Sequence, residues 1–276
     1  MIKSIGFIGG GNMSRAILTS LSQKKDAYKL YVCDRNEEKR AFFQEELKIS
    51  ATQNYQDFIA TLDVIVLAIK PQGFPELLAE LAPLIQPHQL IISIAAGVSV
   101  EAILRGIRQQ HHPVIRVMPN TPATIGLGAS AIYANPDTSP ENREITDSIF
   151  KGCGITAWLE SEEQISAAVA VSGSSPAYIF YLMEIMAKVG ESMGLDAQNS
   201  LALTTQAVLG AAKYSALSTL SLESLKKNVM SPKGTTECAI MSLESNHLDR
   251  IIAEAMQAAF DRDQALSKII SDKIVR

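Results

Sequence analysis

The sequence predicts an α/β fold followed by an all-α region, and three observations carry that prediction. Short, continuously apolar segments alternate with amphipathic stretches up to about residue 160. Nine of the eleven prolines and eleven of the sixteen glycines precede residue 161. After that point the chain is rich in alanine and shows no strand-like alternation. Because helix interiors exclude proline and disfavour glycine, we expect two unlike domains, residues 1–160 and 161–276.

The first domain is expected to hold a parallel sheet covered on both faces. Strands are expected at 5–8, 30–33, 64–68, 90–94 and 113–117, with helices at 13–22, 37–46, 73–84 and 100–108. Strands that are apolar without alternation are buried on both sides. Repeats of about 25 to 30 residues suit right-handed βαβ crossovers.

The second domain is expected to be helical throughout. Its expected helices are 165–170, 178–193, 201–217, 222–229 and 248–270. Their small residues permit close packing, and their apolar content exceeds what so short a region needs for itself. We therefore expect part of this surface to be buried against a second copy of the chain, with packing on the first domain as the alternative.

Composition excludes several classes of protein. The 25 basic and 29 acidic residues give a net charge of −4, which argues against a nucleic-acid-binding surface. Hydrophobic residues make up 47%, too many for a disordered chain. Uninterrupted apolar runs such as 64–69 fall far short of the ~20 residues of a membrane helix, and the first residues do not resemble an export signal. Three cysteines and four histidines show no metal-ligand spacing, so we expect no metal, no disulfide and a reducing cytoplasm.

A glycine-rich segment follows the first expected strand. Gly9, Gly11 and Ser14 match the G-x-G-x-x-G/A fingerprint, with serine at the small third position. Such a turn lets a pyrophosphate approach the N-terminus of the following helix. Because it lies between an expected strand and an expected helix, it predicts a Rossmann-like dinucleotide-binding domain. The expected contacts with the cofactor in this turn are Gly9, Gly10, Gly11, Asn12 and Met13.

Asp34 and Arg35 end the second expected strand, where the ribose of the adenosine should lie. An acidic residue there pairs with the ribose hydroxyls of NAD, whereas an arginine suits the 2′-phosphate of NADP. Both are present, so NAD remains possible. We favour NADP because Arg35 can stack on adenine and hold the phosphate together.

Several motifs along the chain resemble those of one enzyme family. They are Gly6-Phe7-Ile8-Gly9-Gly10-Gly11-Asn12-Met13, Leu67-Ala68-Ile69-Lys70-Pro71-Gln72, Ser93-Ile94-Ala95-Ala96-Gly97, Arg116-Val117-Met118-Pro119-Asn120-Thr121-Pro122-Ala123, Ser172-Gly173-Ser174-Ser175-Pro176-Ala177-Tyr178 and Ser231-Pro232-Lys233-Gly234-Thr235-Thr236. In this order and spacing they resemble the pyrroline-5-carboxylate reductases, over essentially the whole chain. The resemblance implies a dinucleotide domain, a helical dimerisation domain, and reduction of 1-pyrroline-5-carboxylate to L-proline with NADPH or NADH. It also suggests rings of dimers.

The resemblance also implies a substrate site. Reduction of an imine needs a hydride at carbon and a proton at nitrogen, and the imine nitrogen is basic enough to arrive protonated. By resemblance, Thr236 hydrogen-bonds the ring nitrogen, while Ser231 and the amides of Gly234, Thr235 and Thr236 hold the carboxylate. Ser231 and Thr236 are thus the expected catalytic residues. The alternative is that Ser231-Pro232 only breaks and caps helices.

Further cofactor contacts are expected where strands end, at the rim of the crevice. These are Asn54, Ala68, Ile69, Lys70, Pro71, Ala95, Ala96, Gly97 and Asn120. Lys70 suits ribose or phosphate, although Lys-Pro also ends strands. Asn54 suits adenine or its ribose, although it also suits a loop.

Two positions depart from the family pattern. Lys233 and Ser175 stand where the family usually has glycine, so either loop changes shape if the backbone there needs a positive φ. Lys233 also adds a positive charge near the expected site of the substrate carboxylate.

Three alternative functions remain open. A β-hydroxyacid dehydrogenase commonly needs a lysine base, but residues 152–187 contain no lysine, arginine or histidine. A related imine reductase with a six-membered or linear substrate would differ only in pocket volume. A nucleotide-binding regulator with little activity is the third alternative.

Overall fold

The computed structural model describes residues 3–24 and 27–274, which divide into two compact units. One unit is Met1–Ser174 with Ala259–Arg276, and the other is Ser175–Ala258. The division into functional domains at residue 160 stays a prediction. By its contacts, the end of the last helix belongs with the sheet, and we describe each unit by itself.

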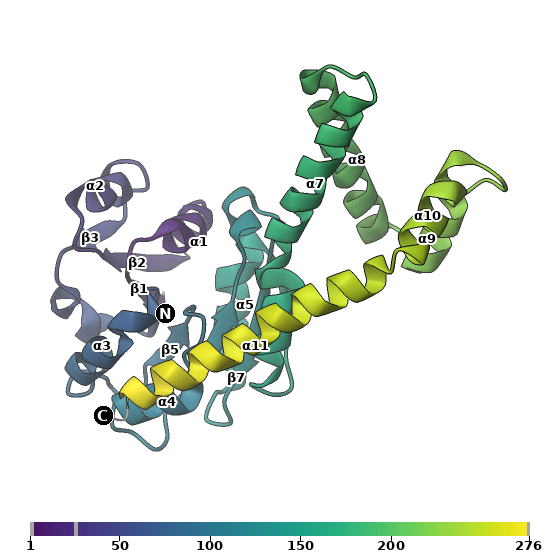
Figure 1. Cartoon of the computed structure of the whole chain (residues 1–276). Helices are drawn as coiled ribbons and strands as arrows, with labels where there is room; N and C mark the ends of the chain where they lie inside the picture. The colour runs from purple at the N-terminus through teal and green to yellow at the C-terminus, as the bar shows by residue number, and fades with distance from the viewer. Residues whose placement is uncertain (1–2, 25–26, 275–276) are drawn as a thin grey trace. The chain divides into compact units, whose positions relative to one another are not determined.

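The first unit is built on an eight-stranded sheet with the order β3-β2-β1-β4-β5-β6-β7-β8 (Figure 1). The strands are β1 (Lys3–Ile8), β2 (Tyr28–Cys33), β3 (Ser50–Thr52), β4 (Val64–Leu67), β5 (Leu90–Ser93), β6 (Val114–Met118), β7 (Gly128–Ala134) and β8 (Gly154–Trp158). The helices of this unit are α1 (Asn12–Ser22), α2 (Glu37–Glu45), α3 (Phe74–Leu81), α4 (Val100–Gly106), α5 (Pro140–Phe150) and α6 (Gln164–Ala168). Single turns of 3₁₀ helix occupy Tyr55–Asp57, Ile59–Thr61, Pro71–Gly73, Thr121–Ile125 and Lys151–Cys153, and a π-helical turn occupies Val169–Gly173. The predicted α/β class and the five predicted strands are confirmed.

The five predicted strands pair in parallel, as expected, and the sheet departs from that pattern at β7, a strand that was not predicted. β7 runs antiparallel to β6, while all other neighbours are parallel. Only nine residues join β6 to β7, too few for the crossover that a parallel connection needs. β3, β7, β8 and α5 were also absent from the expected elements.

Alternate side chains of each strand supply two separate cores. Phe7, Val66 and Ile92 pack against α1, α2 and α5 on one face. Ile65 and Ile91 pack against α3 and α4 on the other, where Ile270 of the last helix joins them. Both faces of the central strands are therefore covered, which explains their continuous apolar sequence.

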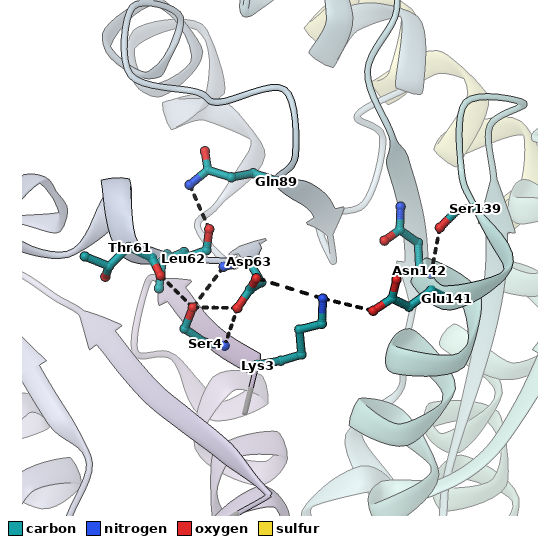
Figure 2. Close-up of polar contacts among 9 residues, drawn as sticks. All are labelled: Lys3, Ser4, Thr61, Leu62, Asp63, Gln89, Ser139, Glu141 and Asn142. Carbon is teal, nitrogen blue, oxygen red and sulfur yellow. Dashed lines mark hydrogen bonds and ion pairs between the residues drawn. The ribbon is translucent and has the colours of Figure 1, made fainter. Parts of the chain in front are cut away.

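A polar network links the N-terminal ends of the central strands to their neighbours (Figure 2). The amide and the hydroxyl of Ser4 donate to Asp63 Oδ2 over 2.7 and 2.8 Å. Lys3 Nζ lies 2.9 Å from Glu141 and 4.0 Å from Asp63. Gln89, fully buried, donates to the carbonyls of Ile59 and Leu62. The start of β1 is thus tied to the turn before β4 and to α5.

The second unit is a set of helices with a small core of its own. It contains α7 (Ser175–Ser192), α8 (Ala197–Leu217), α9 (Leu222–Val229), α10 (Thr235–Ser245) and the first part of α11 (Leu248–Ile274). α7 and α8 lie side by side (Figure 1). The Ser200 hydroxyl donates to the carbonyl of Ala187 over 2.7 Å, and a Cβ added at Gly190 would lie 2.2 Å from Ser200 Oγ. The expectation that small residues permit close helix packing is confirmed here.

Large apolar side chains of this unit remain exposed along α7 and α8. Examples are Phe180, Tyr181 and Leu203, which are 64%, 65% and 60% exposed. Among the described residues, the segment Gln164–Ser192 is long and apolar enough to cross a membrane by length and composition alone. One such segment is weak evidence of a membrane span, since the core helix of a soluble protein passes the same test.

Candidate functional site

The turn after β1 has the geometry of a phosphate-binding loop. Gly9 has a φ of +106°, and its amide donates to the carbonyl of Cys33 over 2.8 Å. A Cβ there would lie 2.5 Å from the carbonyl oxygen of Ala68. Only glycine meets both conditions, so Gly9 sets the turn between β1 and α1.

The N-terminus of α1 is open beside this turn. Gly11 caps the helix without a side-chain hydrogen bond, and nothing lies within 4 Å of the position its Cβ would take. The Ser14 hydroxyl, which is buried, donates to the carbonyl of Gly9 over 2.6 Å. The first amides of α1 therefore begin beside open space, with Asn12 and Met13 starting the helix, and such a helix N-terminus can bind a pyrophosphate.

A hydrogen bond joins Gly10 to Asp34 at the base of the turn. The Gly10 amide donates to Asp34 Oδ2 over 2.8 Å, and the Asn36 amide donates to Oδ1 over 2.9 Å. Gly10 itself is buried, with Phe43 only 2.8 Å from where its Cβ would be. Asp34 thus fixes the glycine turn to the end of β2 while its carboxylate still lines the cleft beyond.

That cleft has a volume of about 440 Å³ and lies where strands of the first unit end. Six of the predicted cofactor residues line it: Gly9, Asp34, Arg35, Asn54, Ile69 and Lys70. The backbone of Arg35 is firmly placed, because the guanidinium of Arg40 donates to the carbonyls of both Asp34 and Arg35 over 2.9 Å. Ala68 and Pro71 adjoin the same rim, and both are half-buried.

Sequence reasoning missed the outer wall of the cleft. Tyr55 and the α3 residues Glu76, Leu77 and Glu80 line it. Tyr55 follows β3, an edge strand of three residues that left no clear pattern. The α3 residues share one helix face by their spacing, which was a usable signal.

Of three further predicted contacts after β5, Ala95 and Gly97 are buried in the first unit. Gly97 has a φ of +70°, and a Cβ there would meet Ile270 and Ser267 of α11 at 3.2 and 3.3 Å. Ala95 is buried, whereas Ala96 is partly exposed. In this structure Gly97 makes room for α11 within the first unit.

Asn120 is also engaged by the protein at both ends of its amide. Its Nδ2 donates to the carbonyl of Ser172 over 2.9 Å, and its Oδ1 accepts from the amide of Ala129 over 2.8 Å. The side chain is buried. Asn120 therefore holds the loop after β6 against β7 and the π-helical turn.

In the second unit, Ser231–Thr236 forms a tight turn between α9 and α10. The Gly234 amide donates to the carbonyl of Ser231 over 2.9 Å, and a Cβ on Gly234 would lie 2.3 Å from Ser231 Oγ. Gly234 caps α10 without a side-chain hydrogen bond, so the amides of Thr235 and Thr236 begin an open helix N-terminus. Thr236 is half-buried and Thr235 is exposed. A carboxylate fits such a turn.

The two departures from the family pattern have different consequences. Lys233 has a φ of +58°, the left-handed conformation that glycine adopts without strain. Its amide donates to Glu237 Oε2 over 2.5 Å, which holds the turn in that shape. Ser175 has no positive φ and begins α7. The serine therefore costs no backbone strain, whereas Lys233 does.

The glycine turn, the open start of α1 and the cleft beside Asp34 and Arg35 define a dinucleotide-binding protein of the Rossmann type. Residues 162–266 match the family model for pyrroline-5-carboxylate reductase dimerisation, and residues 4–97 match the model described as NADP oxidoreductase coenzyme F420-dependent. A pyrroline-5-carboxylate reductase of Pseudomonas aeruginosa is 40% identical over 96% of this chain and 97% of its own. The chain belongs to the pyrroline-5-carboxylate reductase family.

Solved structures agree over the same length. A pyrroline-5-carboxylate reductase of Coxiella burnetii superposes with a TM-score of 0.92 at 36% identity, covering 97% of this chain and 99% of that one. A Plasmodium falciparum pyrroline carboxylate reductase with NADP bound gives a TM-score of 0.83 at 26% identity, covering 96% and 98%. The family assignment that the motifs implied is confirmed.

Proposed function

We propose that this chain reduces 1-pyrroline-5-carboxylate to L-proline with NADPH. The main support is the similarity of this chain to the Pseudomonas aeruginosa enzyme over nearly the full length of both chains. The fold supports it, because the glycine turn, the open start of α1 and the cleft beside Arg35 suit an NADP-type dinucleotide. NADPH supplies the hydride for the imine carbon when bound.

The chain's own residues bind and orient the reactants. The amides at the start of α1 hold the pyrophosphate, and Arg35 and Lys70 provide positive charge for ribose and phosphate. The turn at Ser231–Thr236 holds the substrate carboxylate with its amides and the Ser231 hydroxyl. Thr236 hydrogen-bonds the ring nitrogen of the substrate through its hydroxyl and so orients the imine.

We further propose that the working enzyme is a homodimer, with assembly into rings of dimers as the next level. The match of residues 162–266 to a dimerisation model and the exposed apolar side chains of α7 and α8 support the dimer.

The decisive experiment is NADPH oxidation with 1-pyrroline-5-carboxylate. It is run beside the six-membered cyclic imine and, in reverse, a 3-hydroxy acid with NADP. We expect turnover with the five-membered imine to exceed the others by at least tenfold. No turnover with that imine would overturn the proposal, and a preference for the 3-hydroxy acid would favour the β-hydroxyacid dehydrogenase alternative.

A pair of neighbouring threonines tests the site. Thr236→Ala should lower turnover by roughly 10²-fold with little change in NADPH affinity, because the lost hydroxyl orients the reacting nitrogen. Thr235→Ala is the matched control, since only its amide has a proposed role. Equal losses of turnover and NADPH affinity in Thr236→Ala would indicate a folding defect instead.

Cofactor choice depends on Arg35. We expect Arg35→Ala to raise the KM for NADPH about tenfold or more and the KM for NADH much less, because only the former carries the 2′-phosphate. Steady-state kinetics with both cofactors measure this. An unchanged KM for NADPH would remove Arg35 from the phosphate site.

A further inference from the structure

The cleft of the first unit has an acidic wall that phosphate binding does not explain. Gly73, Glu76, Leu77 and Glu80 line it at the spacing of a single helix face. A carboxylate repels the phosphates that the glycine turn and Arg35 attract. The α3 face therefore suits a part of the dinucleotide that offers hydrogen-bond donors.

One of these carboxylates is held in place from across the cleft. The Tyr55 hydroxyl donates to Glu80 Oε2, joining the turn after β3 to α3. Burial and this hydrogen bond raise the pKa of Tyr55 well above its usual value, so the hydroxyl stays protonated at neutral pH. Because a phenol has one hydrogen and that hydrogen is committed to Glu80, the Tyr55 oxygen can only accept. The Tyr55–Glu80 pair thus presents acceptors.

The arrangement of the fold indicates which part of the cofactor lies here. The pyrophosphate belongs at the glycine turn, and the adenosine ribose at the end of β2. Strand order puts β3 outside β2, so the turn after β3 that carries Tyr55 lies beyond the ribose. The base on that ribose is adenine, whose exocyclic amine is a donor of two hydrogens. Hypoxanthine carries a carbonyl oxygen, an acceptor, at the same position.

We propose that Glu80, positioned by Tyr55, selects the adenine base of the cofactor by accepting from its exocyclic amine. This inference rests on the proposed NADPH-dependent function and adds to it the residue that reads the base. A cofactor with a carbonyl oxygen at that position meets only acceptors, loses this hydrogen bond and binds more weakly.

The test compares NADPH with its reduced hypoxanthine analogue, using nicotinamide fluorescence without imine. We expect the full-length protein to bind NADPH roughly tenfold more tightly, the factor of one charged hydrogen bond. Glu80→Gln should reduce that ratio to about threefold or less, because a rotated amide donates to the carbonyl oxygen. Tyr55→Phe should also lower the ratio, since Glu80 then loses its anchor. Glu101→Gln, at an exposed side chain of α4, is the control and should keep the ratio of the unchanged protein.

Each other outcome counts against the inference. Equal affinity for the two dinucleotides, or an unchanged ratio in Glu80→Gln, overturns it while leaving the proposed function standing. If the affinity ratio falls in Glu76→Gln but not in Glu80→Gln, then Glu76 rather than Glu80 recognises the base, and the inference is overturned. Failure to bind either dinucleotide would overturn the proposed function as well.

Discussion

The two units differ in where their apolar side chains lie. In the first unit, strand residues such as Phe7 and Ile92 are fully buried between helices on both faces of the sheet. In the second, Ala187 and Leu225 are the only apolar residues among those described that are buried. Most of the exposed large apolar side chains of the described chain belong to this smaller unit.

This difference means that the units reach stability by different routes. A core that is complete within one chain stabilises the first unit at any protein concentration. Apolar surface left exposed contributes nothing until another surface covers it, so we propose that the second unit gains stability by association. The dimerisation model over residues 162–266 describes the same region.

The largest expected effect comes from placing a charge on the exposed face of α7. In the proposed homodimer, Phe180→Asp would bury an unpaired carboxylate on each side of the symmetric interface. Each of the two carboxylates would cost on the order of several kcal/mol. Light scattering should show monomer in place of dimer. Lys188→Gln, on the same helix, removes only an exposed ion pair with Glu184 and should leave the mass unchanged. If Phe180→Asp is still a dimer, the interface lies elsewhere, and the exposed face of α7 does not explain how the second unit differs from the first.

A smaller effect is expected in the core of the first unit. Phe7→Ala should lower the free energy of unfolding by about 3–5 kcal/mol, from lost burial and the cavity left behind. Urea unfolding at two protein concentrations measures it, and the loss should be the same at both. Phe180→Ala should instead lower the free energy of unfolding mainly at the higher protein concentration, where the dimer forms. Should Phe7→Ala prove insoluble, Ile92→Val offers a milder change of about 0.5–1.5 kcal/mol at an equally buried position.

The sequence predicted the elements whose burial leaves a pattern. β1, β2, β4, β5 and β6 are continuously apolar because both faces are covered, and their bounds were close to those observed. β3 spans three residues, too few to show a period. β7 is made largely of small residues, and its direction depends on the short connection before it rather than on its own side chains.

The candidate site was likewise predictable only where its residues are consecutive in the sequence. The glycine turn was found because its chemistry lies in consecutive residues. Tyr55 and Glu80 were missed because they meet only after folding, 25 residues apart in the chain. Nothing in the motif around Asn120 indicates that its amide is used up by Ser172 and Ala129, since those contacts arise from the tertiary structure.

The first unit also contains a titrating group whose effect should stay within that unit. Asp63 joins the start of β1 to the turn before β4 (Figure 2). Partial burial alone would raise the pKa of Asp63, but the amide and hydroxyl of Ser4 and the charge of Lys3 outweigh it and hold the pKa below its usual value. The folded chain therefore favours the carboxylate more than the unfolded chain does.

The smallest expected effect follows from that preference. Above the unfolded pKa of about 3.9, Asp63 contributes its full stabilisation, and this is lost as the pH falls through that value toward the lower folded pKa. Because the side chain is 35% exposed, solvent screening limits the contribution to about 1 kcal/mol or less. Asp63→Asn should be less stable than the unchanged protein near pH 6, and the gap should narrow below pH 4. Urea unfolding across that range measures the gap, and light scattering near pH 6 should show the same oligomer for both. A gap independent of pH would mean that Asp63 acts through shape rather than charge, and a changed mass would mean that the two units are not stabilised separately.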